Sequence, residues 1–424
     1  MAMDKRLITK PNQAVILCGG RGSRLKPYTD NMPKPMILCD GKPFLWHIMQ
    51  QLHNQGVSSF VLLTGYLSIQ IEEYFGDGDT WGWNIDYSKG PLKWDTGKRL
   101  WEARNKLDDL FLLLYSDNFA QFPLEKMYSF HKKNKRPLTL MVSPKKSGNI
   151  SLDKSGLVKQ YNNKRCDLGL DYVEIGYMII EKEKTLSFYE NSDCSFSLIL
   201  KKMASKHQIN AWIQNDTYHS ISDPERWEKT NKYLTSKKII LLDRDGVINK
   251  KASQGEYISK WEDFEWIEEA RVTLKVLAQY GFKFIVITNQ AGLSRGMIDA
   301  NNLLIIHNNI RKELIEDGIE ILDFYVCPHH WDEKCWCRKP NPGMLFQASQ
   351  DYLFRLDKSL YIGDDPRDCQ AAFNAGCKSI FIGDTAELKN LSVEQMPSSS
   401  FSNLYESIPT VLNYFDYNPS YDYN

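Results

Sequence analysis

The residues whose types and spacing most clearly indicate chemistry lie in one short segment, CPHHWDEKCWC at 327–337. Thiolates and imidazoles are ligands that zinc prefers, and four of them close a tetrahedral site with no open position. The segment supplies four candidate zinc ligands: Cys327, His329, Cys335 and Cys337. A disulfide is the alternative, although the histidine and a reducing compartment argue against it. A closed zinc site would be structural and would hold the loop that leads into Arg338 and Lys339.

Two aspartates, Asp243 and Asp245, follow the apolar run IILL. Carboxylates two residues apart after a strand project from one turn. With Mg²⁺ between them, one can stay ionised as a nucleophile while the other moves protons. An acidic turn without catalysis is the alternative, because such turns are common. Two later apolar runs also end in polar residues, which are Thr288, Asn289 and Gln290 after FIVI, and Asp364 and Asp365 after SLYIG.

A glycine-rich turn, GGRGSRLKPYTDNMPKP, follows the apolar run AVILC. Its glycines would let backbone amides approach a triphosphate, and Arg21, Arg24 and Lys34 add positive charge. The turn lacks the Lys-Ser or Lys-Thr pair of a P-loop and the spacing of a dinucleotide fingerprint. A tight turn with surface charges is therefore the alternative. The candidate nucleotide-binding residues are Leu17, Gly19, Gly20, Arg21, Gly22 and Ser23.

Alternating strands and helices must position these groups. From Gln13, and again from Lys238, short apolar runs alternate with helix-like stretches, which indicates two α/β domains with parallel sheets. The chemical groups follow the apolar runs directly, and open α/β sheets bind ligands at the carboxyl ends of their strands. We expect domains at 1–235 and 236–412, joined near 228–238, and a flexible tail at 413–424.

The composition restricts the partners. The 424 residues include 53 Lys plus Arg and 53 Asp plus Glu, so no net charge argues for nucleic acid or an anionic membrane as a partner. There is no export signal and no apolar run of membrane-spanning length, which predicts a cytoplasmic protein with small ligands. Six of the nine cysteines are scattered, and we interpret them as reduced: Cys18, Cys39, Cys166, Cys194, Cys369 and Cys377.

The glycine-rich turn resembles the GGxGxRLxPxTxxxPKP signature of sugar-1-phosphate nucleotidyltransferases, which implies a Rossmann-like sheet over about 13–235. Four later segments resemble the same family: DTGKRL at 95–100, YSDN at 115–118, VEIG at 173–176 and ISDPERW at 221–227. In this chemistry the phosphate of a sugar 1-phosphate attacks the α-phosphorus of a nucleoside triphosphate, and cations stabilise the charge as pyrophosphate leaves.

This resemblance implies roles for six residues. Arg24 and Lys34 would steady the triphosphate and stabilise charge at the α-phosphate, and Asp117 would hold Mg²⁺. The others would contact substrates: Gly97 the nucleotide, Glu174 the sugar hydroxyls and Lys164 the sugar phosphate. The family's second metal aspartate, about three residues before the proline–glutamate pair, is missing, and positions 219–223 read HSISD. Either Asp223 is displaced into that role, or Mg²⁺ is held differently, or this domain is a weakened catalyst.

The order DxD, Thr, Lys and GDD in the C-terminal half resembles the haloacid dehalogenase superfamily of phosphatases, over about 237–385. By this resemblance Asp243 attacks phosphorus to form an aspartyl phosphate, while Asp245 protonates the leaving alkoxide and later activates water. The implied phosphate-binding residues are Thr288, Asn289, Gln290 and Lys339. Mg²⁺ would be held by Asp243, the backbone carbonyl of Asp245, Asp364 and, as a further ligand or a support for the ligands, Asp365.

Within this superfamily the series DRDGVIN, TNQAGLSRG, CPHH, CRKPNPGM and GDD resembles the D-glycero-D-manno-heptose 1,7-bisphosphate 7-phosphatases. Histidinol-phosphate phosphatases share most of these motifs and are the competing interpretation. The gaps 243–288 and 339–364 leave no room for a large cap domain, so the zinc loop would restrict access instead. Arg338 would contact substrate phosphate or hydroxyls. The loop at 250–257 is longer than is usual in the family, which leaves the substrate preference open.

Together the two resemblances favour one bifunctional enzyme, because removal of the 7-phosphate yields the heptose 1-phosphate that a nucleotidyltransferase consumes. We expect it to use GTP and to make GDP-D-glycero-α-D-manno-heptose for a bacterial surface polysaccharide or glycoprotein, with Mg²⁺ at both sites and structural Zn²⁺. One alternative is a heptose-bisphosphate or histidinol-phosphate phosphatase whose N-terminal domain senses nucleotide without catalysis. A scaffold that retains enzyme folds is another. The sequence does not predict the oligomeric state.

Overall fold

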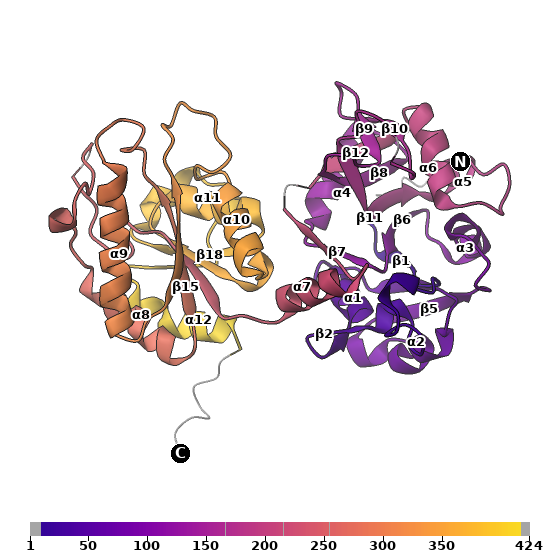
Figure 1. The fold of residues 1–424 in the computed structure, drawn as a ribbon, viewed down its shortest axis with the longest axis horizontal. Coiled ribbons are helices and arrows are strands. Elements are labelled where there is room, and N and C mark those ends of the chain that lie inside the picture. The colour runs from indigo at the N-terminus through magenta and orange to yellow at the C-terminus, as the bar shows by residue number, and fades with distance from the viewer. Residues whose placement is uncertain (1–9, 166, 215, 254, 417–424) are drawn as a thin grey trace, which may run out of the picture. The chain divides into compact units, whose positions relative to one another are not determined.

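The chain folds into two compact α/β units. The computed structural model describes residues 10–165, 167–214, 216–253 and 255–416. Contacts group the chain into Met1–Lys232, coloured indigo to magenta in Figure 1, and Tyr233–Asn424, which runs on to yellow. The division falls within helix α7 (Pro224–Leu234), so the chain is helical where it passes from one unit to the other. The two α/β domains expected from the sequence are confirmed.

The N-terminal unit is built on a mixed nine-stranded sheet. Its order is β10-β9-β11-β6-β1-β4-β5, and β8 joins β11 to β12. Strands β6, β1, β4 and β5 are parallel to one another, whereas β11 is antiparallel to β6 and β8. The sheet strands are β1 (Gln13–Leu17), β4 (Ser59–Thr64), β5 (Asn84–Lys89), β6 (Leu110–Tyr115), β8 (Leu138–Pro144), β9 (Ile150–Leu152), β10 (Val158–Tyr161), β11 (Tyr172–Glu181) and β12 (Ile209–Ile213).

Two small antiparallel sheets of two strands and the described α-helices complete this unit. The small sheets pair β2 (Leu38–Cys39) with β3 (Lys42–Pro43), and β7 (Asn118–Ala120) with β13 (Tyr218–Ser220). Apolar residues of α3 and α6 pack with those of the central strands in one core cluster. The helices are α1 (Phe44–His53), α2 (Ser68–Phe75), α3 (Thr96–Glu102), α4 (Leu124–Asn134), α5 (Lys182–Leu186), α6 (Phe196–Ser205) and α7.

The second unit contains a six-stranded sheet in the order β16-β15-β14-β17-β18-β19, and every pairing is parallel. The central strand IILL is wholly buried, as expected where helices cover both faces of a parallel sheet. The strands are β14 (Ile239–Leu242), β15 (Lys283–Asn289), β16 (Ile321–Cys327), β17 (Leu360–Gly363), β18 (Lys378–Ile382) and β19 (Ser399–Phe401).

Helices cover both faces of this sheet. Figure 1 shows α8 and α9 on one side of it, and α10 and α11 on the other. Residues of α8, α9 and α12 share one core cluster, and residues of α10 and α11 share a second. The helices are α8 (Glu268–Gln279), α9 (Ala300–Glu316), α10 (Gly343–Tyr352), α11 (Pro366–Ala375) and α12 (Ile408–Tyr414).

The sheet order places the predicted chemistry of the second unit at one edge. Because β14 lies between β15 and β17 and all three are parallel, the residues that follow these strands meet at their carboxyl ends. The turns after Leu242, Ile287 and Gly363 therefore form a common site.

The first residues of the tail expected at 413–424 are helical. Helix α12 continues to Tyr414, and the ring of Phe415 packs edge-to-face on Phe282 at 4.9 Å between centroids. The apolar side chains at its start explain the error; residues 417–424 of the predicted tail lie outside the described residues. No described helix combines the length and apolar character needed to cross a membrane.

Candidate functional site

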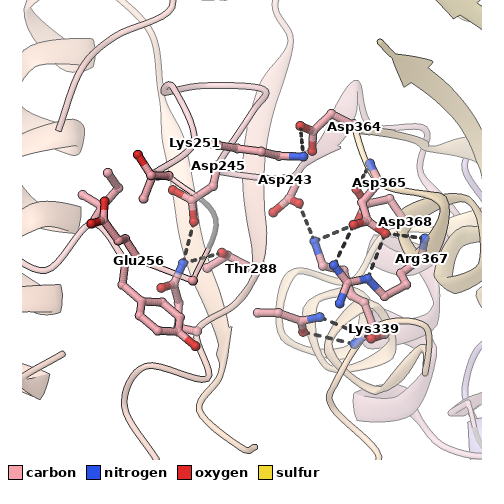
Figure 2. A pocket seen from close by; sticks show the side chains of 17 residues that line it. Asp243, Asp245, Lys251, Glu256, Thr288, Lys339, Asp364, Asp365, Arg367 and Asp368 are labelled. Atoms are coloured by element: carbon pink, nitrogen blue, oxygen red, sulfur yellow. Dashed lines mark hydrogen bonds and ion pairs between the residues drawn. The ribbon is translucent and has the colours of Figure 1, made fainter. Parts of the chain in front are cut away.

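The strand ends of the second unit surround a cavity of about 360 Å³. Figure 2 shows its polar side chains pointing toward one another from the turns after β14, β15 and β17, and from the segments at 251–258 and 339. The lining includes eight of the residues predicted from the sequence: Asp243, Asp245, Thr288, Asn289, Gln290, Lys339, Asp364 and Asp365.

Asp243 and Lys339 form a buried ion pair at the centre of this cavity. The Lys339 ammonium lies 2.9 Å from Asp243 Oδ2, and the two side chains are 3% and 12% exposed. Burial raises the pKa of Asp243 while Lys339 opposes that rise, so the carboxylate depends on nearby positive charge to stay ionised.

Lys339 has further partners that fix its position. It contacts Asp368 Oδ1 at 2.7 Å, and it donates to the carbonyl of Ile287 at 3.0 Å and to the Tyr361 hydroxyl at 2.9 Å. Burial alone would lower the pKa of Lys339, but Asp243 and Asp368 raise it above its usual value. The ammonium is therefore a charged, immobile group next to Asp243.

Asp245 is held from several sides. Arg244, which is fully buried, donates to Asp245 Oδ1 through Nε at 3.1 Å and to both oxygens through Nη2 at 2.9 Å. Asn249 and Gln290 each donate to the same carboxylate at 2.9 Å. Burial alone would raise the pKa of Asp245, but these donors lower it. Arg244 is fixed in turn, because its Nη1 donates to His307 Nε2 at 3.2 Å.

The three residues at the end of β15 have different positions. Thr288 is almost fully buried, and its hydroxyl accepts from Gln290 Nε2 at 2.9 Å, which also links it to Asp245. Asn289 instead pairs with the backbone of Lys339, accepting from its N–H at 3.1 Å and donating to its carbonyl at 3.2 Å. Asn289 therefore positions Lys339, and Thr288 is the side chain available to a phosphoryl group.

The two aspartates after β17, Asp364 and Asp365, have different partners. Asp364 contacts Lys251 Nζ at 2.7 Å through Oδ2, while its buried Oδ1 has no hydrogen-bond partner. Burial raises the pKa of Asp364 to about 6. Asp365 caps α11 and pairs with Arg367 at 2.6 Å. Burial alone would raise the pKa of Asp365, but Arg367 lowers it to about 2.

The carboxylate that joins Asp243 and Asp364 in a metal-type group is Asp368, not the expected Asp365. Asp365 turns back to its own helix because it accepts from the backbone N–H of Arg367 at 2.9 Å. Asp368 lies in the first turn of α11, in a capping box, where its side chain reaches the strand ends. The spacing Asp-Pro-x-Asp is a helix-start signal that could have identified this arrangement.

Space for this group exists because residue 246 is glycine. Gly246 has φ +93°, and a Cβ at this position would lie 1.7 Å from Asp364 Oδ2. A side chain would therefore be strained in its backbone and would overlap the carboxylate.

The cysteine–histidine cluster forms as expected from the sequence. Cys327 Sγ lies 3.6 Å from His329 Nδ1, 3.7 Å from Cys335 Sγ and 3.4 Å from Cys337 Sγ. His329 Nδ1 lies 3.1 Å from Cys337 Sγ. The thiols are free rather than disulfide-bonded, and the four ligand atoms all lie within 4.8 Å of one another, so they can hold a metal ion.

This loop is joined to the cavity through backbone contacts. The Gln290 N–H donates to the carbonyl of Cys327 at 2.8 Å, and Asn341 Nδ2 donates to that of Cys335 at 2.8 Å. Arg338 donates to the carbonyl of His329 at 3.3 Å and is not among the cavity-lining residues. Arg338 therefore braces the cluster, and its predicted contact with substrate stays a prediction.

The segment at 251–258 forms another wall of the cavity. Besides Lys251, it contributes Tyr257, whose hydroxyl accepts from Arg295 Nη1 at 3.1 Å. The Arg295 guanidinium also lies over the ring of Trp331, 5.3 Å from its centroid. This wall is thus connected, through Trp331, to the loop that carries the cysteine–histidine cluster. Residue 254 lies outside the described residues.

In the N-terminal unit the glycine-rich turn follows β1 as expected. Gly22 has φ +67°, and a Cβ there would lie 2.8 Å from Lys34 Cβ, so glycine is required where these two segments approach. Gly20 faces open space, whereas the Arg99 guanidinium lies against Gly19. Arg21 lies over the Tyr66 ring at 5.5 Å. The Leu17 carbonyl accepts from Ser116 Oγ at 2.7 Å, and Ser23 begins a short 3₁₀ turn.

Lys34 and Asp117 are brought together. Their side chains form an ion pair of 2.8 Å and are 12% and 31% exposed. Arg24, also exposed, is close enough to Asp223 to lower the pKa of that carboxyl, after the hydrogen bond from the Arg226 N–H. Lys34 and Asp117 are therefore in direct contact, and Arg24 lies near Asp223.

Glu174, on β11, lies next to the same site. It accepts from the Tyr161 hydroxyl at 2.7 Å, while its Oε2 is buried without a partner. Burial raises the pKa of Glu174 to about 7; Arg165 opposes the rise and Asp117 adds to it. Oε2 is therefore an acceptor available to a ligand.

Two of the predicted N-terminal residues, Gly97 and Lys164, have no described contact with Lys34, Asp117 or Glu174. Gly97 packs in α3, where a Cβ would meet the carbonyl of Cys194 at 2.5 Å, so packing accounts for this glycine. Lys164 is exposed, and only its backbone N–H has a described contact, with Asn162. The basic residues near the site that sequence reasoning missed are Lys145, Arg165 and Arg226. They lie on loops and a helix surface where basic residues are common, so no pattern indicated them.

Asp223 is not displaced into a metal position. It caps α7, accepting from the Arg226 N–H at 3.0 Å and from Ser222 Oγ at 2.9 Å. Ser220, three residues earlier, pairs with Asn118 where β13 lies antiparallel to β7, and the Ile221 N–H donates to the carbonyl of Asp117 at 3.0 Å. The residue that meets Asp117 in this pairing is therefore Ile221, which carries no carboxylate.

Comparisons with known proteins match each unit to a family. Residues 13–178 match the nucleotidyl transferase family, and residues 238–403 match the polynucleotide kinase 3 phosphatase family. D-glycero-alpha-D-manno-heptose-1,7-bisphosphate 7-phosphatase of Photorhabdus laumondii is 39% identical over 152 residues, which is 34% of this chain and 81% of that protein.

Two further relatives are more distant or partial. The histidine biosynthesis bifunctional protein HisB of Campylobacter jejuni is 33% identical over 168 residues, covering 39% of this chain and 48% of HisB. The crystal structure of HddC from Yersinia pseudotuberculosis is 24% identical, with a TM-score of 0.45, and covers 51% of this chain and 96% of that one.

Proposed function

Since the chain belongs, through its second unit, to the family of heptose-1,7-bisphosphate 7-phosphatases and carries a nucleotidyltransferase domain before it, we propose that it is a bifunctional enzyme of nucleotide-heptose biosynthesis. The second unit would remove the 7-phosphate of D-glycero-D-manno-heptose 1,7-bisphosphate. The first would transfer a nucleotidyl group to the resulting heptose 1-phosphate and release pyrophosphate. The observation that carries the proposal is the union of these successive chemistries in one chain.

The geometry of the cavity fits phosphate transfer through a covalent intermediate. The Asp243 carboxylate attacks phosphorus, and the alkoxide of the sugar leaves with a proton from Asp245. Asp245 must take up this proton before the step, because its donors favour the carboxylate in the substrate-free cavity. Asp245 then takes a proton from water, which attacks the aspartyl phosphate and releases inorganic phosphate and Asp243. Lys339 and Thr288 stabilise the phosphoryl oxygens. Arg244 fixes the direction of the Asp245 carboxylate throughout.

The carboxylates at the strand ends fit a magnesium ion. Asp243, Asp364 and Asp368 offer oxygens within 4.8 Å of one another, and Asp364 Oδ1 is buried without a partner. Mg²⁺ prefers such oxygen ligands and would supply positive charge to the phosphoryl group and to Asp243. Asp245 would add its backbone carbonyl, as the family resemblance implies. Its carboxylate would not bind the metal and would take part in proton transfer.

The cluster in the adjoining loop fits zinc. Metal–sulfur and metal–nitrogen bonds of about 2.3 and 2.0 Å give tetrahedral edges of about 3.8 Å between sulfurs and about 3.5 Å between sulfur and nitrogen. The observed separations run from 3.1 to 3.7 Å. All four positions are filled by protein, so zinc would have a structural role and would hold Gln290 and Lys339 in place through the loop.

In the N-terminal site, Arg24, Lys34 and the amides of the glycine-rich turn would bind the triphosphate, and Asp117 would bind the Mg²⁺ that accompanies it. Glu174 Oε2 would accept from a sugar hydroxyl. These groups hold the sugar phosphate and the α-phosphorus in line, and no protein nucleophile is needed. We propose GTP as the nucleotide and GDP-D-glycero-α-D-manno-heptose as the product.

The proposal is tested by incubating the full chain with heptose 1,7-bisphosphate, Mg²⁺ and an equimolar mixture of ATP, GTP, CTP and UTP. Mass spectrometry of the products is expected to show a GDP-heptose. Another nucleotide sugar would correct only the base. Heptose 1-phosphate without any nucleotide sugar would favour a nucleotide-sensing N-terminal unit, which the missing second aspartate would explain. A parallel incubation contains histidinol phosphate instead of the bisphosphate. Hydrolysis of histidinol phosphate while the heptose bisphosphate stays unchanged would contradict the proposal.

A further inference from the structure

Five basic side chains from different segments gather at the N-terminal site. Lys34 forms the 2.8 Å ion pair with Asp117, and Arg24 acts on Asp223. Burial lowers the pKa of Lys145, and the positive charges of Arg165 and Arg226 lower it further. Arg165 in turn acts on Glu174, whose own pKa also responds to Asp117. Each of these basic side chains therefore has a charged group of this unit near enough to influence it.

The carboxylates of this space leave one protein ligand for a cation. Glu174 accepts from Tyr161 with one oxygen and keeps the other for a sugar hydroxyl, while Asp223 Oδ1 accepts from the Arg226 N–H and Oδ2 accepts from Ser222 Oγ. Asp117 is the one that remains at the end of β6. Within the described ranges, the side-chain groups able to hold a metal through three ligands both lie in the second unit. A site with two metal-binding aspartates, as the family resemblance implies, does not fit these residues.

Arg226 lies where the second carboxylate is missing. Its Nη1 is 3.4 Å from Ser220 Oγ and its Nε is 3.5 Å from Asp223 Oδ2. Ser220 pairs with Asn118, and the Ile221 N–H donates to the carbonyl of Asp117 at 3.0 Å, so this guanidinium is anchored beside the residue that would bind the metal. The Arg226 side chain is 50% exposed, and both contacts are long. It can therefore turn toward a ligand at little cost.

We propose that Arg226 binds the phosphate group of the sugar 1-phosphate in the N-terminal site, beside Asp117. The inference rests on the proposed nucleotidyltransferase function and adds a ligand contact to it. A sugar phosphate that approaches a triphosphate brings like charges together, so its affinity depends on fixed positive charge. A guanidinium supplies that charge with two parallel donors that match phosphate oxygens. The charge of Arg226 acts on Lys145, and that of Arg165 acts on both Lys145 and Glu174.

The test is the affinity of the full chain for heptose 1-phosphate, measured by titration calorimetry in EDTA. The variants are Arg226→Gln, Arg226→Lys and, as a control of equal charge loss on the same helix, Lys232→Gln, which breaks an exposed pair with Glu228. Arg226→Gln is expected to weaken binding by about 10- to 100-fold, the usual range for a lost charge-assisted hydrogen bond. The affinity of Arg226→Lys is expected to lie between those of the parent chain and Arg226→Gln. The affinity of the control Lys232→Gln is expected to match that of the parent chain. Any binding by the second unit is common to all four proteins and drops out of the comparison.

The same proteins are titrated with GTP, and unchanged GTP affinity shows that the N-terminal unit is folded. Equal heptose 1-phosphate affinity in the parent chain and Arg226→Gln, or no binding by the parent chain, would overturn the assignment. Pyrophosphate release with GTP separates the two proposals. Binding that depends on Arg226 without pyrophosphate release would refute the transferase activity while supporting the Arg226 contact. Release with an unchanged KM for heptose 1-phosphate in Arg226→Gln would refute the contact alone.

Discussion

The two candidate sites of this chain hold their charges in different ways. In the second unit Arg244, Lys339 and Asp368 are 0%, 3% and 1% exposed, and each has several partners within the protein. In the first unit Lys34 and Asp117 are 12% and 31% exposed and have one described ion pair between them. One site is assembled before substrate arrives, whereas the other is left open.

The difference follows from the chemistry proposed for each site. A covalent intermediate on Asp243 requires the nucleophile, the acid Asp245 and the cation Lys339 to keep fixed distances through two steps. Nucleotidyl transfer joins two substrates that bring their own phosphates, so the protein needs cations that can adjust to them. Buried pairing would cost affinity there, because each internal contact must be broken before a phosphate binds.

The sharpest way to break the comparison is to remove the nucleophile. Asp243→Asn is expected to lower phosphatase turnover by about 10⁴-fold or more, since the side chain forms the covalent bond. Pyrophosphate release from supplied heptose 1-phosphate and GTP, measured in the same protein, should be unchanged. Loss of both activities would show that the two sites do not work independently.

The second test removes the cation of the open site. Lys34→Met is expected to lower nucleotidyl transfer by about 10²- to 10³-fold, the effect of losing one group that stabilises developing charge. Phosphatase activity should not change. Lys26→Met, an exposed lysine of the same turn that pairs with Asp30, is the control and should transfer normally. Equal losses in the two variants would mean that general charge, rather than the Lys34–Asp117 pair, matters.

The third test compares the two neighbouring carboxylates after β17. Asp368→Asn is expected to weaken Mg²⁺ activation of the phosphatase by about 10- to 100-fold, because the residue both adjoins the cation site and pairs with Lys339. Asp365→Asn removes a helix cap and should act mainly on stability. Titration of activity with Mg²⁺ in both variants decides the matter, and the reverse order would restore the original assignment of Asp365.

Removing the metal of the loop should have a smaller, one-sided effect. Cys335→Ser is expected to lower bound zinc below one ion per chain and phosphatase activity at least about tenfold, because the loop holds Gln290 and Lys339. Nucleotidyl transfer should persist. Zinc content by atomic absorption and both activities are measured together. A zinc-free protein with full phosphatase activity would refute the structural role.

The smallest expected effect is a pH dependence confined to the open site. Since burial raises the pKa of Glu174 to about 7, its carboxyl is neutral below that pH and loses an acceptor for a sugar hydroxyl. The KM for heptose 1-phosphate should therefore rise about tenfold between pH 8 and pH 6. Glu174→Gln should have a raised KM that no longer changes with pH. A parent KM that is flat over this range would contradict the role of Glu174.

The sequence predicted the second site better than the first, for a physical reason. Apolar strands of a parallel sheet end at a common edge, so the residues after IILL, FIVI and SLYIG had to meet. The cysteine–histidine cluster was equally predictable from its residue types and their spacing. Asp368 was missed because adjacent aspartates after a strand look equivalent until the phase of the following helix is known, and only the capping pattern separates Asp365 from it.

The open site was predicted less completely. Its glycine-rich turn, Lys34 and Asp117 belong to patterns that the sequence displays. Arg165 and Arg226 do not, because a basic residue on a loop or on the surface of a helix has no periodicity that distinguishes it from a solvated charge. The nucleotide contact of Gly97 stays a prediction, and close packing against Cys194 is a second reason for glycine at this position.

The absence of a side chain at Gly246 also limits how this protein can change. Even alanine would place a methyl group 1.7 Å from Asp364 Oδ2 while holding a backbone with φ +93° that L-residues rarely adopt. Any substitution of Gly246 would thus be unfavourable for two reasons, the backbone conformation and the lack of space for a side chain. A saturation library of the second unit should find no tolerated replacement here, so the empty space beside the carboxylate is as much an inherited catalytic part as the residues that surround it.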